Sequence, residues 1–356
     1  MNQDFFLNRA FELALRGSGF VAPNPMVGAV LVHEGRILGE GWHEQYGEAH
    51  AEVNCLNQVA AADRHLIPQS TLYVTLEPCA HYGRQPPCAL RLVQEKVKKV
   101  VIATNDSFAQ VNGKGIEMLR QGGVAVEILD NQQTGRWLNR RFFTAQEKKR
   151  PYLILKWAQS ADGFIAPLSR QRTQLSHPFT RTLTHRWRAA ESAMLVGYQT
   201  ALHDNPALDA RHWNNHHPLR ILIDRRLELP LTHRVLDGSL PTWILNEQTD
   251  KEIGLTHFLK SDFENFFPQL FERLLAAGKT SLFVEGGAFT LQQFLDKNWW
   301  DETRVYHTPA ALGAGIAAPV IPVSGQAAFE TAIGSDVLRQ QVHPDSGFTW
   351  SNAFPF

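Results

Sequence analysis

Strand-like and helix-like segments alternate along this chain of 356 residues, and this alternation restricts its fold more than any other feature. The strand-like segments of the first half are apolar runs at 27–33, 36–42, 71–76, 98–104 and 124–129. Amphipathic helical patterns separate most of them, and a further one opens the chain over residues 1–17. The short Glu34-Gly35 turn predicts a hairpin. Strands that alternate with helices predict a three-layer α/β domain with a largely parallel sheet.

The alternation is interrupted by the polar stretch TAQEKKR at 144–150, which is followed by Pro151. A new strand-like run begins at 152, and strands and helices then alternate again to about residue 309. A charged stretch before a proline is typical of a linker, and the chain is long for a single core. We therefore expect two successive α/β domains, at 1–144 and 145–356.

Composition favours a small-molecule substrate. The chain has 35 Lys and Arg and 35 Asp and Glu residues, so it lacks the basic excess of proteins that wrap nucleic acid. No apolar run approaches the roughly 18 residues that span a bilayer, and the first residues lack a signal-peptide pattern. Three cysteines are too few for a disulfide scaffold. We expect a cytoplasmic protein with no nucleic-acid or membrane partner.

Three potential metal ligands stand at the ends of predicted elements in the first domain. His50 opens a helix, Cys79 follows Pro78 just after a strand, and Cys88 opens the next helix after Pro87. Two thiolates and one imidazole suit Zn²⁺, which prefers four tetrahedral sulfur and nitrogen ligands. Three protein ligands leave the fourth position for water, which is typical of a catalytic site. We therefore predict one zinc ion in this domain.

Glu52 lies two residues after His50, so on a helix its side chain points about 200° away from that ligand. We expect Glu52 not to bind the metal but to move a proton from the attacking water to the substrate, as in nucleobase deaminases. Alternatively, the cysteines are buried small apolar residues, or the zinc is structural and has a fourth Cys or His ligand. Cys55, on an apolar helix face, is predicted to be core.

The second domain contains a segment suited to a dinucleotide. The strand-like run SLFVEGG ends in Glu285-Gly286-Gly287 and leads into a helix. Such a turn places bare backbone N–H groups at a positive helix end, where they can hold a phosphate. A Gly-Gly pair is also common in ordinary tight turns. Arg188 and Arg211 suit a phosphorylated sugar, or are surface charges.

The first domain resembles the bifunctional deaminase–reductase family of riboflavin biosynthesis, the RibD family. The matching motifs are Asn24-Pro25 with Val27-Gly28, Gly41 with His43, His50-Ala51-Glu52, and TLEPCAHYGRQPPC at 75–88. Nucleic-acid deaminases space their cysteines as Cys-x-x-Cys, whereas a longer His-x-Gly-Arg-x-Pro-Pro loop separates them here. The resemblance implies a cytidine-deaminase-like fold for this domain.

By this resemblance, the deaminase substrate is a phosphoribosylamino-pyrimidine. The residues implied to contact it are Asn24, His43, His81 and Arg84. A cation at Arg84 suits the ribose 5-phosphate, and the alternative is a solvated loop charge. The family's Asp-Pro-Asn-Pro motif begins here at Asp106 but continues Ser107-Phe108-Ala109, so no contact is carried over beyond Asp106.

The second domain resembles the family's reductase, which has a dihydrofolate-reductase-like fold and uses NADPH. The matching segments are LKWAQSADG at 155–163, the run at 185–211 and SLFVEGGAFTLQQF at 281–294. The residues implied to meet the substrate are Arg188, Leu208, Arg211 and Glu285. Those implied to meet NADPH are Ala158, Gln174, Thr200, Asp204, Gly286 and Gly287. Gln174 replaces an aromatic residue usual in the family, and we interpret it as a lineage variant.

These features predict a bifunctional enzyme that deaminates the pyrimidine hydrolytically and then reduces its ribosyl chain with hydride from NADPH. Lys156 and Glu285 are the candidates for the acid–base residue of the reductase. The resemblance also implies a homo-oligomer, either a dimer or a tetramer. Two other hypotheses are a nucleic-acid base deaminase and a non-catalytic zinc protein. The Pro-Pro-Cys loop and zero net charge argue against the first, and Glu52 argues against the second.

Overall fold

The computed structural model describes residues 3–82, 86–106, 113–129, 132–214, 216–322 and 326–350. Within them the chain forms two compact units, one up to residue 148 and the other from residue 149. The polar stretch predicted as a linker is helical as far as Glu147, and Thr144 within it is buried. No helix in the described ranges has the length and apolar character needed to cross a bilayer.

The first unit is built on a five-stranded sheet with the order β2-β1-β3-β4-β5. Its strands are β1 (Gly28–His33), β2 (Arg36–Trp42), β3 (Thr71–Val74), β4 (Lys99–Ile102) and β5 (Ala125–Ile128). β3, β4 and β5 are parallel, but β1 is antiparallel to both of its neighbours. The predicted hairpin accounts for the β1–β2 pair, because Glu34 and Gly35 have positive φ and send β2 back along β1. The antiparallel β1–β3 pair departs from the predicted largely parallel sheet.

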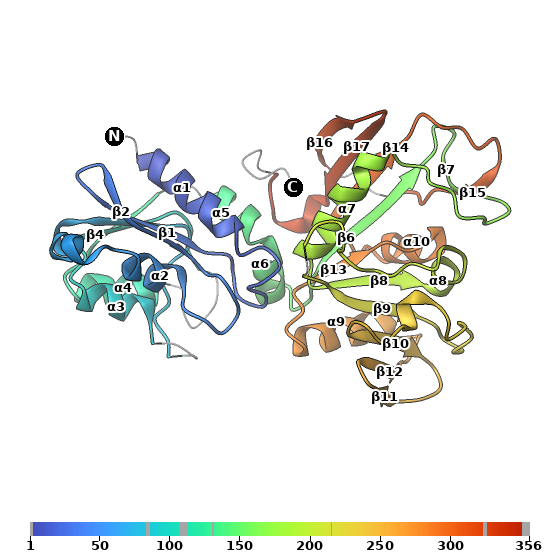
Figure 1. Ribbon diagram of the computed structural model, residues 1–356, viewed down its shortest axis with the longest axis horizontal. Helices are drawn as coiled ribbons and strands as arrows, with labels where there is room; N and C mark the ends of the chain where they lie inside the picture. Colours follow the sequence, from blue (N-terminus) through green and yellow to red (C-terminus); the bar gives the residue numbers. More distant parts are fainter. Residues whose placement is uncertain are drawn as a thin grey trace. The chain divides into compact units, whose positions relative to one another are not determined.

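Helices cover both faces of this sheet, which confirms the predicted three-layer α/β architecture (Figure 1). The helices are α1 (Gln3–Leu15), α2 (Ala51–Asn57), α3 (Cys88–Gln94), α4 (Lys114–Gln121), α5 (Gln132–Leu138) and α6 (Arg140–Glu147), with a 3₁₀ segment at Ala61–Gln69. Successive strand residues point to opposite faces. Val30 and Val32 therefore pack with α1, whereas Ala29 and Leu31 pack with α2, α3 and α4.

The second unit contains a ten-stranded sheet with the order β11-β12-β10-β9-β8-β13-β6-β14-β17-β16 and a two-stranded sheet of β7 and β15. Its strands are β6 (Tyr152–Gln159), β7 (Phe164–Pro167), β8 (Ala193–Gly197), β9 (Leu219–Ile223), β10 (Thr242–Asn246), β11 (Lys251–Ile253), β12 (Thr256–Lys260), β13 (Ser281–Val284), β14 (Glu302–His307), β15 (Gly315–Ala317), β16 (Gln326–Ile333) and β17 (Asp336–Val342). The seven strands from β12 to β14 are parallel, and the outer ones are antiparallel.

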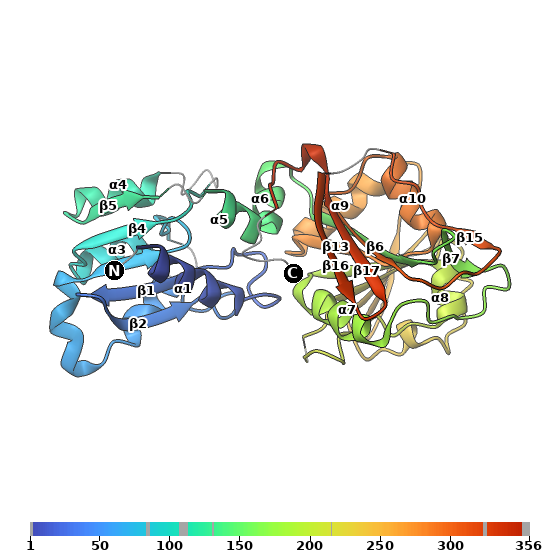
Figure 2. The same cartoon turned by 90° about the horizontal axis from the view of Figure 1, so that it is seen from above.

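The helices of the second unit also lie on both faces of its large sheet (Figure 2). They are α7 (Pro178–Ala190), α8 (Tyr198–Asp204), α9 (Phe266–Ala276) and α10 (Ala288–Asp296), with 3₁₀ turns at Arg234–Leu236 and Pro344–Ser346. Leu282 and Val284 of β13 share a core with α9 and α10. Phe283, between them, points the other way and meets Trp187 of α7. The second predicted α/β domain is thereby confirmed as an α/β unit.

Candidate active sites

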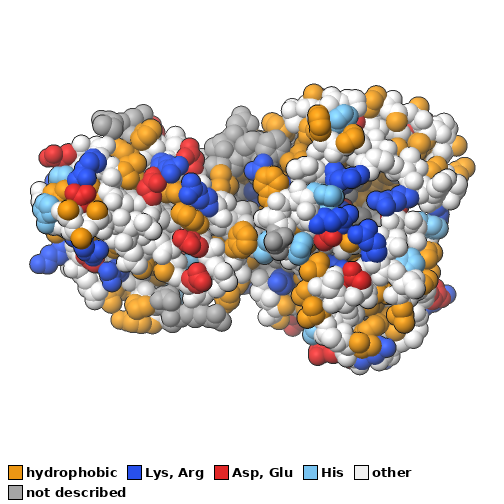
Figure 3. Space-filling view, in the orientation of Figure 1, with side chains coloured by type: hydrophobic (Ala, Val, Ile, Leu, Met, Phe, Trp, Pro, Cys, Tyr) orange, Lys and Arg blue, Asp and Glu red, His pale blue; other side chains and the backbone are white. Residues whose placement is uncertain are grey.

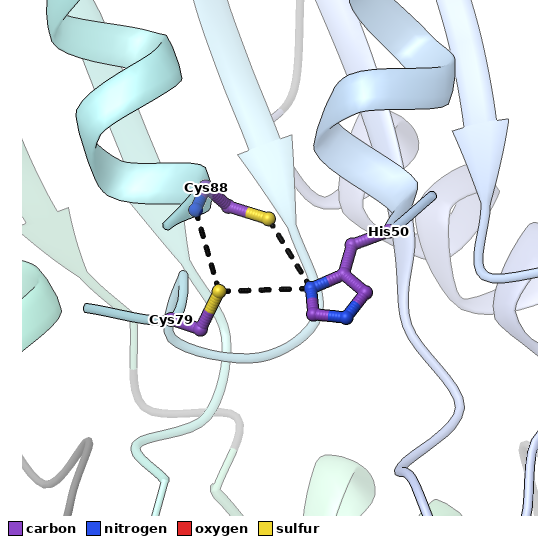
Figure 4. Close-up of side chains that lie close together, drawn as sticks. All are labelled: His50, Cys79 and Cys88. Atoms are coloured by element: carbon purple, nitrogen blue, oxygen red, sulfur yellow. Dashed lines mark hydrogen bonds between the residues drawn. The ribbon is translucent and has the colours of Figure 1, made fainter. Parts of the chain in front are cut away.

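Side chains from two helix starts and one loop converge in the first unit (Figure 4). His50 is the N-cap of α2, with extended backbone angles of φ −78° and ψ 168°. Cys88 is the first residue of α3, and Pro87 is its N-cap. Cys79 lies in the loop between β3 and α3, and its Sγ accepts the backbone N–H of Cys88 at 3.3 Å. The structure thus brings the three predicted zinc ligands together.

The distances between the ligand atoms fit a tetrahedral zinc ion. His50 Nδ1 lies 3.6 Å from Cys79 Sγ and 3.3 Å from Cys88 Sγ, and the three atoms lie within 4.8 Å of one another. Two ligands at the usual Zn–S and Zn–N bond lengths and a tetrahedral angle stand about 3.6 Å apart. Two sulfurs and an imidazole nitrogen are also donors that zinc prefers. The residues present therefore fit one zinc ion.

The two thiols differ in acidity. A hydrogen bond from the Cys88 thiol, and a weaker effect of His50, lower the pKa of Cys79 against the opposing effect of burial. The same contact, together with burial, raises the pKa of Cys88. One thiolate is therefore already favoured in this cluster, and a bound cation would favour loss of the second proton.

Glu52 lies in the first turn of α2 and is only 3% exposed. Its carboxyl group hydrogen-bonds Cys88, but it is not one of the three clustered ligands. Burial, and then the nearby Cys79, raises the pKa of Glu52. A carboxyl group in this position can take up and release a proton beside the metal ligands without occupying a coordination position.

A second buried carboxylate, that of Glu77, anchors the loop that carries Cys79. Its oxygens accept backbone N–H groups at the start of α4, from Gly113 at 3.1 Å and Gly115 at 3.0 Å. A Cβ on Gly115 would lie 1.9 Å from the carbonyl oxygen of Pro78, so only glycine permits this approach. Glu77 was not among the predicted site residues. The available signal was an acidic residue next to a buried strand, where its charge requires partners.

The predicted pyrimidine contacts Asn24 and His43 lie beside the metal ligands. Asn24 Nδ2 lies 3.2 Å from His43 Nε2, and His43 Nδ1 lies 3.1 Å from the carbonyl oxygen of Ala49. Since an amide NH₂ only donates, His43 Nε2 accepts and Nδ1 carries the proton. The His43 ring meets the His50 ring edge-on at 5.1 Å between centroids. Asn24 and His43 therefore form a hydrogen-bonded pair next to the cluster.

Two further predicted contacts belong to the loop between the two cysteines. His81 is half-buried there, whereas Arg84 lies outside the described residues. Asp106, where the family motif breaks off, is buried, and the residues after it at 107–112 also lie outside the described ranges. The arrangement of the phosphate-binding part of this site stays a prediction.

In the second unit, Arg188 of α7 and Glu285 after β13 form a buried ion pair. Arg188 Nε and Nη2 donate to the two Glu285 carboxylate oxygens at 2.9 and 2.7 Å. Burial opposes ionisation, but the charges of Arg188 and of Lys156 on β6 outweigh it and lower the pKa of Glu285 to about 2. Burial lowers the pKa of Lys156. Two predicted substrate contacts and a candidate acid–base residue are thus brought together.

The loop after α8 carries two more predicted residues to the same helix. Arg188 Nη1 donates to the backbone oxygen of Asp209 at 3.1 Å, which holds this loop against α7. Arg211 Nη1 lies 2.6 and 2.7 Å from the two carboxylate oxygens of Asp209. Leu208 is buried and has a φ of 53°, which is uncommon for leucine. Asp209 was not predicted, and the signal for it was an acidic residue two positions before an arginine that is predicted to bind the substrate.

Two neighbouring parallel strands of this unit, β8 and β13, lead through glycines into helices. β8 ends at Gly197, the N-cap of α8, and β13 leads through Gly286 to Gly287, the N-cap of α10. A Cβ on Gly286 would lie 2.8 Å from the Cβ of Thr290, and one on Gly287 would lie 3.0 Å from Thr200 Oγ1. No side chain of Gly286 or Gly287 covers the backbone N–H groups before α10, as binding of a dinucleotide phosphate requires. These residues fit NADPH.

The remaining predicted cofactor contacts are less closely grouped. Ala158 is half-buried on β6, where it pairs with Tyr306 of β14. Asp204, at the end of α8, is half-buried, and burial raises its pKa. Gln174 is exposed, and within the described part of the chain its side chain hydrogen-bonds only in its own loop, to Ser176. The structure thus places Gln174 in an exposed loop between β7 and α7.

The free energy of unfolding is expected to depend on pH because of His185 in α7. Burial, and then the charges of Arg188 and His212, lower the pKa of His185 to about 4. The unfolded chain, with a histidine pKa of about 6.5, therefore binds more protons than the folded chain between pH 6.5 and 4, and stability falls as the pH falls through this window. His185→Gln is expected to reduce this fall, measured as urea midpoints at pH 7, 5.5 and 4.5. Equal slopes in both proteins would contradict the prediction.

Both units of the chain match protein families. Residues 1–104 match the cytidine and deoxycytidylate deaminase zinc-binding region, and residues 151–336 match the RibD C-terminal domain. The riboflavin biosynthesis protein RibD of Aquifex aeolicus is 37% identical over 319 residues, which are 87% of this chain and 88% of that protein. RibD of Bacillus amyloliquefaciens is 36% identical over 91% of this chain and 89% of that protein.

Solved structures show the same likeness over both units. The crystal structure of a diaminohydroxyphosphoribosylaminopyrimidine deaminase/5-amino-6-(5-phosphoribosylamino)uracil reductase from Thermotoga maritima matches with a TM-score of 0.88 and 31% identity, covering 96% of this chain and 98% of that one. Form 1 of Acinetobacter baumannii RibD matches with a TM-score of 0.85 and 31% identity, covering 95% and 98%.

The fold and the two sites define an enzyme with a zinc-binding deaminase unit and a reductase unit that uses NADPH. The chain belongs to the family of the riboflavin biosynthesis protein RibD. It is thus a bifunctional deaminase and reductase of riboflavin biosynthesis. The predicted family, enzyme class and cofactors are confirmed.

Proposed function

We propose that the first unit deaminates 2,5-diamino-6-(5-phosphoribosylamino)pyrimidin-4-one and that the second unit reduces the ribosyl chain of the product to a ribityl chain. The Thermotoga maritima relative carries the names of a deaminase and a reductase of this kind. The observation that carries the proposal is the buried Glu52 beside the cluster of His50, Cys79 and Cys88, in a chain that also has the bare turn before α10.

In the deaminase, His50, Cys79 and Cys88 hold the zinc ion. When bound, zinc acidifies water and so supplies a nucleophile at neutral pH. Glu52 is proposed to carry the first proton of the attacking water to the ring nitrogen and then the second one to the departing amine, which leaves as ammonia. Its burial and its contact with Cys88 support this role.

The substrate of the deaminase is held by groups around this cluster. Asn24 and His43 are proposed to bind the pyrimidine ring, and their mutual hydrogen bond fixes the His43 tautomer, in which Nε2 accepts and Nδ1 donates to the Ala49 carbonyl oxygen. His81 and Arg84 are proposed to contact the phosphoribosyl group, by likeness to the family motif. A guanidinium group suits a phosphate because its planar donors match two oxygens at once.

In the reductase, NADPH supplies a hydride to the C1′ carbon when it is bound. The residues proposed to hold it are Ala158, Gln174, Thr200, Asp204, Gly286 and Gly287. Those proposed to hold the substrate are Arg188, Leu208, Arg211 and Glu285. As C1′ gains the hydride, the ring oxygen must gain a proton. Of the two candidates, Lys156 and Glu285, we propose Lys156 as the donor, because the lowered pKa of Glu285 keeps that carboxyl group ionised against Arg188. The burial that lowers the pKa of Lys156 favours proton release.

The deaminase is assigned to residues 1–144 and the reductase to residues 145–356. We also expect a cytoplasmic homo-oligomer, either a dimer or a tetramer, that has small-molecule substrates and does not bind nucleic acid or membranes. Light scattering coupled to size-exclusion chromatography measures the oligomeric state.

One incubation tests both activities. The zinc-loaded protein is mixed with the diaminopyrimidine phosphate and NADPH, and ammonia and NADPH absorbance are followed separately. Both are expected to change, and chelation of zinc beforehand is expected to stop both, since the reductase then lacks its substrate. Adding the deaminated uracil derivative to the chelated protein is expected to restore NADPH oxidation. Ammonia release from tRNA or single-stranded DNA, with none from the pyrimidine phosphate, would overturn the proposal.

Gly286→Ala is expected to weaken NADPH binding roughly tenfold, which corresponds to about 1.4 kcal/mol. The added Cβ would lie 2.8 Å from the Cβ of Thr290, so the turn before α10 must shift. The measurement is the Kd of NADPH from fluorescence titration, with ammonia release by the same protein as the internal control. An unchanged Kd would remove this turn from the cofactor site.

A further inference from the structure

Charged and titratable side chains gather between α7 and the loop at 205–218 of the second unit. Figure 3 shows a group of Lys, Arg and His side chains on the face of the second unit that is in view. His185 and Arg188 come from α7, and Asp209, Arg211 and His212 come from the loop. The His185 and His212 rings lie edge-on, 4.6 Å apart. Asp209 is the acidic side chain among these five, and the other four are arginines and histidines.

The two arginines of the group are paired in different ways. Arg188 uses two nitrogens for the two oxygens of Glu285, and the side chains are only 14% and 10% exposed. Arg211 uses one nitrogen for both oxygens of Asp209, and its own side chain is 43% exposed. A two-nitrogen buried pair is strong and fixed, whereas an exposed single-nitrogen pair is weak. Of the two, the Asp209–Arg211 pair is the one that a ligand can displace.

The Asp209 carboxylate therefore occupies the guanidinium group of Arg211 in the way that the phosphate of a ligand would. A carboxylate and a phosphate both offer two acceptor oxygens to a guanidinium group. The loop cannot carry Asp209 away entirely, because its backbone oxygen is held by Arg188 at 3.1 Å. If a ligand takes Arg211, the Asp209 carboxylate must turn to another partner within reach of its fixed backbone.

His185 is that partner. Its Nδ1 lies 3.9 Å from Asp209 Oδ1, just beyond hydrogen-bond distance. This nitrogen is buried and has no hydrogen-bond partner among the residues that the structure describes, and the side chain is 5% exposed. The groups that face His185 are Arg188 on its own helix, Asp209, Arg211 and His212 from the loop, and Glu285 from the turn after β13. A rotation of the Asp209 carboxylate would close the remaining gap.

We propose that Asp209 is an internal counter-ion of Arg211, and that a phosphorylated substrate binds by displacing the Asp209 carboxylate from Arg211 onto His185, which takes up one proton from solvent. The proposal rests on the assignment of Arg211 to the reductase substrate site. No covalent bond changes: one ion pair is exchanged for two, Arg211 with the phosphate and His185 with Asp209.

The electrostatics of the group favour proton uptake only after the exchange. In the free site, the charges of Arg188, His212 and Arg211 add to burial and lower the pKa of His185, while Asp209 raises it. A phosphate on Arg211 cancels one of the opposing charges and brings Asp209 closer. His185 therefore becomes a better base when the ligand is bound, and ligand affinity falls as the pH rises.

Asp209→Asn tests the counter-ion. The amide cannot replace the carboxylate on Arg211, so ribose 5-phosphate is expected to bind roughly threefold to tenfold more tightly than to the unchanged protein. Ribose without phosphate is expected to bind equally to both. The matched control is Glu330→Gln, which removes one acidic charge from the exposed Glu330–Arg339 pair and is expected to leave the Kd unchanged. An unchanged or weaker affinity in Asp209→Asn would overturn the proposal.

Proton uptake is a second, independent measurement. Titration calorimetry with ribose 5-phosphate at pH 7.5, in buffers of different ionisation enthalpy, counts the protons taken up on binding. The unchanged protein is expected to take up more protons than either His185→Gln or Asp209→Asn. Thermal melts of the variants show whether they are folded. Equal proton uptake in the unchanged protein and in His185→Gln would overturn the exchange onto His185.

Arg211→Ala separates this proposal from the assignment of the substrate site. If Arg211→Ala binds ribose 5-phosphate as tightly as the unchanged protein does, Arg211 does not hold the phosphate and both assignments fail. If Arg211→Ala weakens binding but Asp209→Asn does not strengthen it, only the counter-ion role fails. If both variants behave as expected but the chain does not oxidise NADPH, the ion-pair exchange stands and the reductase assignment fails.

Discussion

Glu52→Gln is expected to lower the rate of ammonia release by at least a hundredfold while the chain still binds one zinc ion. General acid–base groups typically contribute between about 10² and 10⁴ to a rate, and an amide can neither take up nor deliver the proton. Zinc is expected to stay because the three clustered ligand atoms belong to His50, Cys79 and Cys88. The measurements are ammonia release and bound zinc, determined on the same preparation.

The matched control for this variant is Glu95→Gln, which removes a carboxylate from the surface pairs of Glu95 with Arg64 and Arg91 in the same unit. It is expected to release ammonia at the normal rate. Ammonia release at the normal rate by zinc-loaded Glu52→Gln would refute the proposed proton transfer. Loss of zinc from this variant would instead show that Glu52 supports the metal site.

Arg188→Ala is expected to have the largest effect in the second unit, on both stability and reduction. It leaves the Glu285 carboxylate buried without its two-nitrogen partner, and removal of one member of a buried pair typically costs about 3–5 kcal/mol. It also releases the loop at Asp209. We expect a lower urea midpoint and no detectable NADPH oxidation with the uracil substrate.

The double variant Arg188→Met with Glu285→Gln distinguishes packing from chemistry. It removes both charges and keeps similar volumes, so it is expected to recover a large part of the lost stability without recovering reduction. Arg181→Met, at an exposed position of α7, is the control and is expected to change neither property. Recovery of reduction in the double variant would show that the ion pair only supports the fold.

The helices and strands that could be predicted are those whose apolar residues form a continuous run or recur with a regular period. The β16–β17 hairpin was not predicted, because the side of β17 that packs inward alternates apolar and polar residues. Asp336 and Gln340 are buried on that side together with Leu338 and Val342. Hydrophobic periodicity identifies a strand only when its buried side is apolar. The antiparallel pairing of β1 with β3 was not predicted either, since pairing direction depends on the connections between strands and not on their composition.

Among the site residues, spacing and residue type were sufficient for the zinc cluster. A histidine and a cysteine at two helix starts, with a further cysteine after a strand, suit zinc whichever fold holds them. Glu77, His185 and Asp209 could not be predicted in this way. The importance of each depends on partners distant in the sequence. These are the start of α4 for Glu77, the loop after α8 for His185, and α7 for Asp209. Only the tertiary structure provides those partners.

The sequence by itself therefore determined the α/β class and the family resemblance, and it predicted the division into two units, the zinc ligands and the role of Glu52. These properties follow from local pattern and residue chemistry, which are readable along the chain. The tertiary structure decided which charges lie next to one another. In the folded chain Arg188 is paired with Glu285, and Arg211 is paired with Asp209. Asp209 in turn lies beside the buried His185. The physical reason is that burial and the distance between charges set the strength of an ion pair, and both exist only after folding.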